Sequence, residues 1–368
     1  MAEGFDATTL SRVLGAPVTS YDVAPIDPDV RIHSVTGGVY RIRTDVGACV
    51  VKVVRRGHDE DPDGLWVSGA EPTHRNYWKR EWLAFDSGLL DSLPGRLRAP
   101  RRLLTAQASD SECWIWMEDV RGRTSDHIEL DDYGAIACAL GSTQGAFAAG
   151  DPPPPTQEWL SRRWLRGWVQ AGARNAALIT DDAVWQDTRL APLQPLRGRA
   201  LAVWAVRDEL LGIVESAPQT LVHLDFWPHN LFVTEDDVVA IDWSQIGIGA
   251  VGQDLDQLTL DAVWMHVLPD VDPRQLERRV LPAYLHGLAE AGFDVDESDL
   301  RRWYAAAAAA HYVPMLGFSA TLAADPEKAE AREARHARSF AEIVTTHARV
   351  LQRAVELGEW ALGDTRQS

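Results

Sequence analysis

The residues best suited to chemistry are gathered in the segment 220–243. His223, Asp225 and Asn230 follow the spacing HxDxxxxN, and Asp242 comes 12 residues after Asn230, at the end of a short apolar run. Phosphoryl transfer needs such a set: a carboxylate that accepts the proton of an attacking hydroxyl, and an asparagine and an aspartate that hold Mg²⁺. Their oxygen atoms are also the ligands that Mg²⁺ prefers. The segment therefore predicts a catalytic loop between two short strands.

Two features upstream could serve the phosphates of a nucleotide. Lys52 interrupts the apolar run CVVKVV, where a charge needs a partner or an anionic ligand. Lysine is a rare choice here, since only three of the 36 basic residues are Lys. Gly37 and Gly38 lie in the segment 34–40, SVTGGVY, and adjacent glycines let backbone amides approach phosphate oxygens closely. The pattern predicts a phosphate-covering loop followed by a strand lysine.

Taken in order, these features resemble the aminoglycoside phosphotransferase and choline kinase family, small-molecule relatives of the protein kinases. The resemblance runs from about residue 34 to about residue 260. It implies Asp225 as the catalytic base, His223 as the organiser of the loop, and Asn230 and Asp242 as ligands of Mg²⁺. It also implies ATP as the phosphate donor, and it matches Asp254 to an aspartate that begins a helix after the metal-binding segment.

The resemblance also assigns residues to the nucleotide. The nucleotide-binding residues that it implies are Gly37, Gly38, Lys52, Glu81, Glu118 and Val120. The two glycines would cover the phosphates, and the lysine would bind them while pairing with the glutamate of the following helix. The last two residues follow the apolar run CWIWM and resemble the hinge between two lobes, where main-chain groups meet the adenine.

The chain departs from the family pattern at three places. Leu224 and His229 stand where the family often has glycine, so the loop's backbone is expected to differ. About 20 extra residues, 57–76, separate the lysine strand from the glutamate helix. No activation segment ends in an APE-like motif, which argues against a protein kinase.

The periodicity of the chain changes from strand-like to helical along its length. Two β-branched runs, 35–43 and 48–54, are joined by a polar turn that ends in glycine, which predicts a hairpin. Apolar residues at helical spacing predict a helix over 75–90, and 113–117 reads as a strand. Helical segments are expected near 131–149, 157–176, 199–215, 254–268, 273–291, 298–323 and 326–358.

This order of elements predicts an α+β fold, protein-kinase-like and two-lobed. The small β-rich N-lobe would span residues 1–119 and bind the nucleotide. The larger, mainly helical C-lobe would span 120–368 and carry the catalytic loop, the metal site and the helices that bind the acceptor.

Composition excludes several classes of protein. The net charge of −18 over 368 residues argues against nucleic-acid binding, because the field would repel phosphates. The stretch 303–324 has no charged side chain over 22 residues, but it contains a proline and several polar residues, so we interpret it as a buried helix and expect no membrane partner. Three cysteines, without CxxC spacing or a signal peptide, favour a cytoplasmic protein. The oligomeric state is left open.

The residues alone leave alternatives to a kinase that phosphorylates a small molecule. His223, Asp225 and His229 could ligate the metal of a hydrolase, and the same fold could belong to a nucleotide-binding pseudokinase. The acidic segment 59–64 begins like a calcium loop, but its closing position is Ala70, not Glu. A polar turn, a solvent-facing lysine or a plain glycine turn are the structural alternatives for the motif residues.

The acceptor expected for this kinase is an aminoglycoside, an amino sugar or an amino alcohol, with choline-like acceptors less favoured. Asp256 and Asp261 add negative charge that would suit a cationic acceptor. Trp227, Trp243 and Trp264 lie near the motif in sequence, where they either pack in the core or form an aromatic wall for a sugar ring or a cation.

Overall fold

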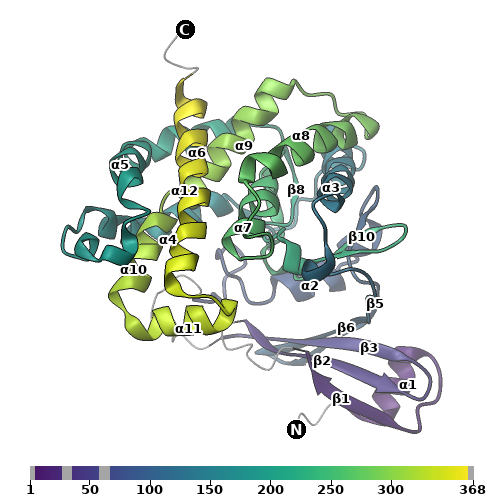
Figure 1. The fold of residues 1–368 in the computed structure, drawn as a ribbon. Helices are drawn as coiled ribbons and strands as arrows, with labels where there is room; N and C mark the ends of the chain where they lie inside the picture. The colour runs from purple at the N-terminus through teal and green to yellow at the C-terminus, as the bar shows by residue number, and fades with distance from the viewer. Residues whose placement is uncertain (1–4, 27–34, 58–66, 364–368) are drawn as a thin grey trace. The chain divides into compact units, whose positions relative to one another are not determined.

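A computed structural model describes residues 5–26, 35–57 and 67–363. The chain forms two compact units. The first comprises Met1–Arg123, Thr156–Ser161 and Phe232–Ile246, and the second comprises Thr124–Pro155, Arg162–Leu231 and Gly247–Ser368. The predicted α+β fold is confirmed: an N-terminal antiparallel sheet is followed by a mostly helical part (Figure 1). The segment 59–64 and Ser34 lie outside the described residues.

The first unit is built on a five-stranded antiparallel sheet in the order β1-β2-β3-β6-β5. Its strands are β1 (Tyr21–Pro25), β2 (Thr36–Thr44), β3 (Ala48–Arg55), β5 (Arg102–Ser109) and β6 (Glu112–Glu118). Helix α1 (Ala7–Leu14) contributes Leu10 and Val13 to a core that also contains Ile42, Val51 and Trp116. The predicted hairpin and the strand near 113–117 are therefore present.

The helix expected over 75–90 is shorter, since α2 spans only Arg80–Asp86. The reason lies in Arg80, whose guanidinium is fully buried. It donates hydrogen bonds to the backbone carbonyls of His74 and Arg75 at 2.7 and 2.8 Å, and these bonds hold the preceding chain in turns. The same guanidinium donates to the carbonyls of Trp159 at 2.8 Å and Ser244 at 3.2 Å. One side chain thus ties together the three separate pieces of the first unit.

A smaller sheet joins segments that are distant in sequence. Strand β10 (Val238–Ala240) pairs in parallel with β4 (Leu97–Arg98), and β9 (Leu231–Val233) completes the order β4-β10-β9. This pairing brings the end of β10, and with it Asp242, into the first unit.

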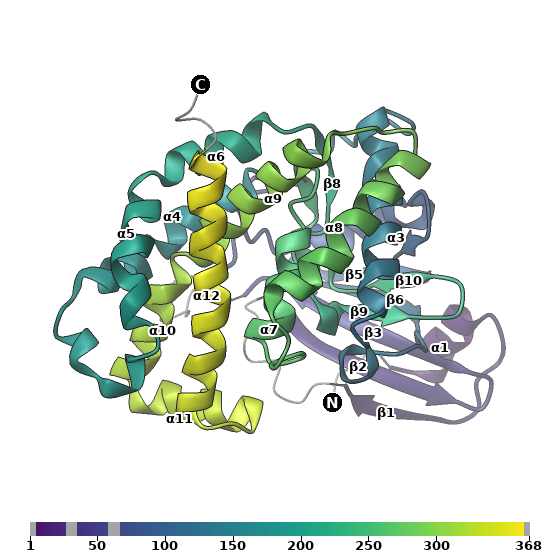
Figure 2. The same ribbon diagram turned by 45° about the horizontal axis from the view of Figure 1, so that its top comes forward.

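The second unit contains most of the helices, together with strand β8 (Gln219–Val222), which pairs antiparallel with β11 (Gly247–Ala250). The two-residue strand β7 (Ser161–Arg162) precedes its α4. The helices are α3 (Asp132–Ala149), α4 (Trp164–Ala177), α5 (Arg197–Ala205), α6 (Arg207–Ser216), α7 (Ala262–Trp264), α8 (Pro273–Glu290), α9 (Glu297–Tyr312), α10 (Met315–Ala324), α11 (Pro326–His336) and α12 (Phe340–Gly363). In Figures 1 and 2, α3 lies beside α8.

Several expected helices are divided. Pro314 separates α9 from α10, because proline lacks the N–H of a helical turn and its ring clashes with the preceding turn. Ala337, in the left-handed conformation, separates α11 from α12. The helix expected over 254–268 is replaced by a π-helical turn, Gln257–Asp261, and the short α7. The helix expected over 157–176 begins later, at Trp164. The helix expected over 199–215 is divided at Val206 into α5 and α6.

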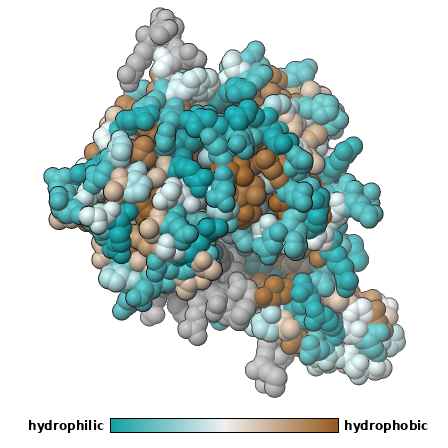
Figure 3. All heavy atoms as spheres, viewed as in Figure 1, coloured by the Kyte–Doolittle hydropathy of each residue, from teal (hydrophilic) through white to brown (hydrophobic). Residues whose placement is uncertain are grey.

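The uncharged stretch 303–324 is packed inside the helical unit, as predicted. Its six consecutive alanines are 0–2% exposed, and α12 packs against α9. The small alanine side chains let the neighbouring helices approach α9 closely. None of the helices in the described residues is long and apolar enough to cross a bilayer. Figure 3 shows hydrophilic residues over most of the visible face of this unit, with hydrophobic residues gathered near α8 and α9.

Candidate functional site

Lys52, Glu81 and Asp242 form a buried ion cluster in the first unit. Lys52 lies in the middle of β3, where its neighbours across the sheet are Val39 and Ile115. Its Nζ atom is 2.6 Å from Oε2 of Glu81 and 2.8 Å from Oδ1 of Asp242. The Lys52 and Glu81 side chains are 8% and 3% exposed, whereas that of Asp242 is 26% exposed. The apolar strand thus holds a cation between two carboxylates, one of which faces outward.

Two carboxylates surround the single ammonium group of this cluster. Burial alone would lower the pKa of Lys52, but the carboxylates of Asp242 and Glu81 outweigh burial and raise this pKa above its usual range. Burial raises the pKa of Glu81 to about 7, while Lys52 opposes that shift. Lys52 therefore stays protonated at neutral pH.

Asp242 has an unusual backbone conformation. It follows β10 with φ 58° and ψ 65°, the left-handed region that residues other than glycine rarely adopt. The next residue, Trp243, is buried and donates from its indole nitrogen to the carbonyl of Ala240 at 2.7 Å. This bond closes a tight turn that orients Asp242 toward Lys52. Backbone strain of this kind persists only where the surrounding structure enforces it.

The two glycines lie at the start of β2. The register of β2 against β3 shifts between Thr36 and Gly38, as in a β-bulge. Gly38 has φ 154°, and a Cβ atom there would lie 2.6–2.8 Å from the ring of Tyr40. At Gly37 a Cβ atom would lie 3.0 Å from the side chain of Val53. The backbone conformation therefore favours glycine at Gly38, and a larger residue would also have to displace the end of the Tyr40 side chain.

The residues after β6 are only partly available for a ligand. The carboxylate of Glu118 accepts hydrogen bonds from the side chain of Arg98 and from the backbone N–H of Arg101, the latter at 3.0 Å. The backbone N–H of Glu118 donates to the carbonyl of Arg101 at 3.0 Å. Val120 follows, half-buried, beyond the end of the strand. Both the N–H and the carboxylate of Glu118 thus already have partners within the first unit.

The catalytic-loop motif lies in the second unit and is held by Asp254. The backbone N–H groups of His223 and Leu224 donate to its two carboxylate oxygens at 2.9 and 2.8 Å. Leu224 has φ 64°, in the left-handed region that residues other than glycine rarely adopt. Gln144 of α3 donates to the same carboxylate at 2.8 Å. Burial raises the pKa of Asp254 to about 7, against these donors, which lower it.

Asp225 and Asn230 are in direct contact. The side-chain amide of Asn230 donates to Oδ2 of Asp225 at 2.7 Å and to its backbone carbonyl at 3.0 Å. The backbone N–H of Asp225 donates to Nδ1 of His223 at 3.2 Å, which places the ring proton on Nε2. Since both bonds of Asn230 use its amide nitrogen, its side-chain oxygen faces another direction and is chemically suited to a cation.

His223, Asp225 and His229 do not form a three-ligand group among the described residues. His229 instead contacts Ser125, with 3.0 Å between Oγ and Nδ1, and its ring lies 4.6 Å from that of Trp227. This arrangement gives the metal-hydrolase alternative no geometric support.

A group of three histidines and Arg332 lies in the second unit, with His347 buried and the others half-buried, and sequence reasoning missed it. The rings of His266 and His336 are 4.7 Å apart, and the ring of His347 stacks on Trp264 at 3.6 Å. Among the described residues, no hydrogen-bond partner is found for either nitrogen of His266, for Nε2 of His336 or His347, or for Nε of Arg332. These residues come from three distant segments without a local motif, so no pattern marked them.

Burial, assisted by neighbouring arginines, keeps these imidazoles neutral. It lowers the pKa of His266 to about 4 and that of His336 to about 3. The shift at His336 includes a contribution from His229, which places the group within electrostatic range of the catalytic loop. Neutral imidazoles both donate and accept hydrogen bonds.

The two acidic residues expected to favour a cation have little exposure to solvent: Asp256 is buried beside His311, and Asp261 is half-buried. Asp256 lies 2.9 Å from Nδ1 of His311 and is 3% exposed. Burial raises the pKa of Asp261 to about 6. Trp243 and Trp264 are each 2% exposed, which agrees with core packing, whereas Trp227 is half-buried.

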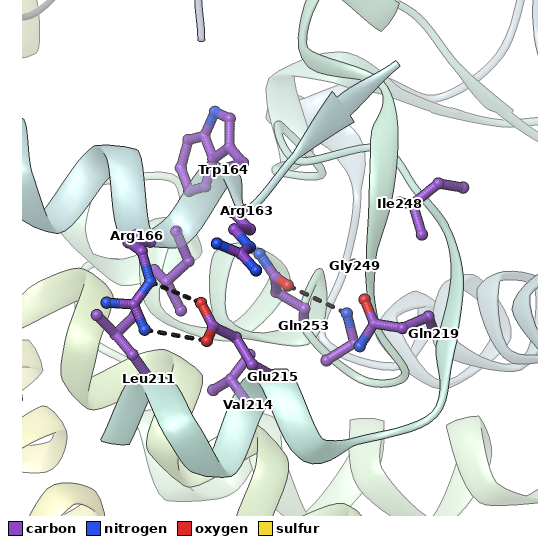
Figure 4. Close-up of a pocket in the computed structure, with 12 residues that line it drawn as sticks. Arg163, Trp164, Arg166, Leu211, Val214, Glu215, Gln219, Ile248, Gly249 and Gln253 are labelled. Atoms are coloured by element: carbon purple, nitrogen blue, oxygen red, sulfur yellow. Dashed lines mark hydrogen bonds and ion pairs between the residues drawn. The ribbon is translucent and has the colours of Figure 1, made fainter. Parts of the chain in front are cut away.

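A separate cavity of about 180 Å³ lies between the start of α4, helix α6 and strand β11 (Figure 4). Arg166 and Glu215 face each other across it through two bonds of 2.8 and 3.0 Å, and Gln253 accepts a hydrogen bond from the N–H of Ala250 at 3.2 Å. None of the motif residues lines this cavity.

Comparison with known proteins gives a family and a fold. Residues 33–303 match the model of the phosphotransferase enzyme family. No curated protein sequence matches the chain.

Two solved structures are similar in fold. An amicoumacin kinase in complex with AMP-PNP, Ca²⁺ and Ami is 13% identical with a TM-score of 0.53, covering 92% of this chain and 91% of that one. A choline kinase from Cryptosporidium parvum Iowa II is 13% identical with a TM-score of 0.54, covering 94% and 92%. Since the family model covers well over half of the sequence, the chain belongs to the phosphotransferase enzyme family of small-molecule kinases.

Proposed function

We propose that this protein transfers the γ-phosphate of ATP to a hydroxyl group of a small molecule. The observation that carries the proposal is the buried cluster in which Lys52 is held by Glu81 and Asp242. A lysine fixed in this way presents a permanent positive charge, as an ATP-dependent kinase requires for the phosphates. The family membership supports the same reaction.

The residues of the second unit would act on the acceptor. Asp225 accepts the proton of the acceptor hydroxyl as it attacks, and His223 keeps Asp225 in place by accepting its backbone N–H at 3.2 Å. Asp254 acts as a positioning residue because it fixes the two backbone amides that precede Asp225. The positions needed for turnover are all filled, which argues against a pseudokinase.

Asn230 and Asp242 are the residues that would hold Mg²⁺. Both offer oxygen atoms, the ligand type that this cation prefers, and Asp242 is already oriented beside a bound cationic group. The metal ion, when bound, supplies positive charge that offsets the negative charge of the phosphates.

The remaining nucleotide contacts belong to the N-terminal part, for which we keep the lobe boundaries 1–119 and 120–368. Gly37 and Gly38 would let the backbone of β2 approach the phosphates, and the φ of 154° at Gly38, which favours glycine, supports this role. Glu118 and Val120 would meet the adenine through main-chain groups.

The acceptor that we propose is an aminoglycoside, an amino sugar or an amino alcohol. The support is chemical: the neutral imidazoles of His266 and His336 can both donate to and accept from sugar hydroxyls. A polyhydroxylated acceptor would satisfy several buried nitrogen atoms at once. The engagement of Asp256 by His311 weakens the case for a purely cationic acceptor such as choline.

The test is release of ADP from Mg·ATP by the purified protein in the presence of aminoglycosides, amino sugars, choline or other small alcohols. We expect release to depend on both Mg²⁺ and one class of acceptor. Acceptor-dependent release that continues unchanged in excess chelator would contradict the metal assignment. Failure of the protein to bind Mg·ATP would contradict the proposed function itself.

A further inference from the structure

Three residues with metal-binding side chains meet on the surface of the helical unit, away from all the motifs. Cys138 lies on α3, and His286 and Glu290 lie one turn apart on α8. One ligand atom from each lies within 4.8 Å of the others. The Sγ atom of Cys138 is 3.7 Å from Oε2 of Glu290, and Nε2 of His286 is 3.3 Å from Oε1 of Glu290.

The two helices hold these three residues next to one another because the helix backbones touch. A Cβ atom at Gly287 would lie 2.2 Å from the carbonyl oxygen of Cys138, and one at Gly141 would lie 2.3 Å from that of Tyr284. Only glycine permits such an approach. Figure 2 shows the two helices side by side. The helix packing therefore sets the three residues side by side, while the side chains of His286 and Glu290 are exposed to solvent.

We infer that Cys138, His286 and Glu290 form a binding site for a thiophilic divalent cation, with Zn²⁺ as the fitting ion. Zinc bonds of about 2.3 Å to sulfur and about 2.0 Å to nitrogen and oxygen, at tetrahedral angles, separate sulfur from oxygen by about 3.5 Å and nitrogen from oxygen by about 3.3 Å. The observed separations are 3.7 Å from sulfur to Oε2 of Glu290 and 3.3 Å from nitrogen to Oε1, and all three ligand atoms lie within 4.8 Å of one another. Rotation of these side chains about their own bonds would bring sulfur, nitrogen and one carboxylate oxygen to the distances that zinc requires.

The donor set selects against the cation of the proposed kinase reaction. Mg²⁺ and Ca²⁺ prefer oxygen ligands, whereas a thiolate and an imidazole favour Zn²⁺ and its neighbours among the transition metals. On binding, the S–H bond of Cys138 is replaced by a sulfur–metal bond and the proton leaves to solvent. The thiolate and the Glu290 carboxylate together balance the charge of the ion, and water completes its coordination.

The proposed metal site lies on the two helices, α3 and α8, that support the catalytic loop through Asp254. Gln144 of α3 donates to Asp254, the residue that holds the catalytic loop, and Tyr284 of α8 in turn donates its hydroxyl to Gln144. Cys138 precedes Gln144 by less than two turns of α3, and His286 follows Tyr284 closely on α8. An ion bound here would clamp the helix pair that supports the catalytic loop.

The test uses untagged, metal-free, full-length protein titrated with Co²⁺, whose absorption reports both thiolate ligation and tetrahedral geometry. We expect a thiolate-to-cobalt band that saturates at one equivalent and disappears when one equivalent of Zn²⁺ is added. Cys138→Ser should abolish the band and Glu290→Gln should weaken it. Cys113→Ser, the same change in the sheet of the first unit, should leave the band intact.

The inference is overturned if wild-type protein shows no thiolate band in excess Co²⁺, or if Cys138→Ser retains it. Thermal unfolding gives a second readout, since an ion that binds only the folded state raises the midpoint. Zn²⁺ should raise the midpoint of the wild type and not that of Cys138→Ser. Neither measurement depends on kinase activity, so the outcome is independent of the proposed function.

Discussion

Replacing Lys52 by methionine tests the buried ion cluster directly. Methionine fills a similar volume without charge, so the change removes the ammonium group that lies 2.6 Å from Glu81 and 2.8 Å from Asp242. The carboxylate of Glu81 is then left without its partner, although it is only 3% exposed. Asp242 is more exposed, so water can replace part of its lost partner. The penalty should therefore arise mainly at Glu81.

The size of the loss in unfolding free energy depends on whether Glu81 stays charged once Lys52 is removed. Breaking a buried ion pair by removing one partner costs about 3–5 kcal/mol when the remaining group stays charged. Glu81 can instead be neutralised by a proton, because burial already raises its pKa to about 7 and the loss of Lys52 raises this pKa further. Near neutral pH it takes up a proton, so we expect a loss of about 2–3 kcal/mol in the free energy of unfolding.

The loss should depend on pH in a fixed direction. In Lys52→Met the folded-state pKa of Glu81 lies above its unfolded value, so the folded state binds the extra proton between those two values. Stability of the variant therefore decreases as pH rises through that window. The deficit relative to wild type should be small at about pH 5.5 and largest at about pH 8.5.

Urea unfolding followed by tryptophan fluorescence at both pH values measures the deficit. Adding Glu81→Gln to Lys52→Met removes the unpaired carboxylate and should recover part of the loss, with a coupling energy of about 1–3 kcal/mol. Lys79→Met is the matched control, because Lys79 contacts the neutral side chain of Gln107 at 2.9 Å and should show no pH-dependent deficit. Equal deficits at both pH values, or strictly additive single changes, would refute the reasoning.

Three further predictions concern the loops and the buried histidines. Gly38→Ala should raise the KM for ATP more than it lowers kcat, because the φ of 154° strains alanine and the backbone at the start of β2 would shift to relieve that strain. An unchanged KM would count against a phosphate-covering role. Asp254→Asn keeps the shape of the side chain but weakens its hold on two backbone amides, so kcat should fall while Mg·ATP affinity, measured by calorimetry, stays unchanged; loss of ATP affinity would oppose a positioning role. The depressed pKa values of His266 and His336 mean that the unfolded chain binds more protons below about pH 6.5, so stability should fall as pH drops from there toward 4, and changing both to Asn should flatten that slope in urea unfolding; an unaltered slope would contradict their burial as neutral rings.

The local patterns of the sequence were sufficient to predict three of the five strands of the first sheet, β2, β3 and β6, and its lysine, but not strands β1 and β5. β-branched runs around a polar turn specify the hairpin of β2 and β3, and Lys52 stands out because a charge in an apolar strand is rare. The contact between Lys52 and Glu81 also matches expectation, despite the extra residues between their elements.

Long-range contacts were beyond sequence reasoning because no local pattern encodes them. The parallel pairing of Val238 with Leu97 joins segments about 140 residues apart, and the guanidinium of Arg80 is bonded to carbonyls from three separate stretches. The role of Asp254 was equally hidden, since it depends on tertiary hydrogen bonds to His223 and Leu224, and not on helix capping. Helix periodicity likewise missed breaks at single residues such as Pro314.

The most direct test of the central claim compares acceptor-dependent ADP release by wild type, Asp225→Asn and Asp236→Asn. Asp236 is exposed in the turn before β10, so it provides the same chemical change outside the motif. Loss of a general base costs about 10²- to 10⁴-fold in rate, and we expect this loss only in Asp225→Asn, with Mg·ATP binding retained. Equal rates in the two variants would contradict the account.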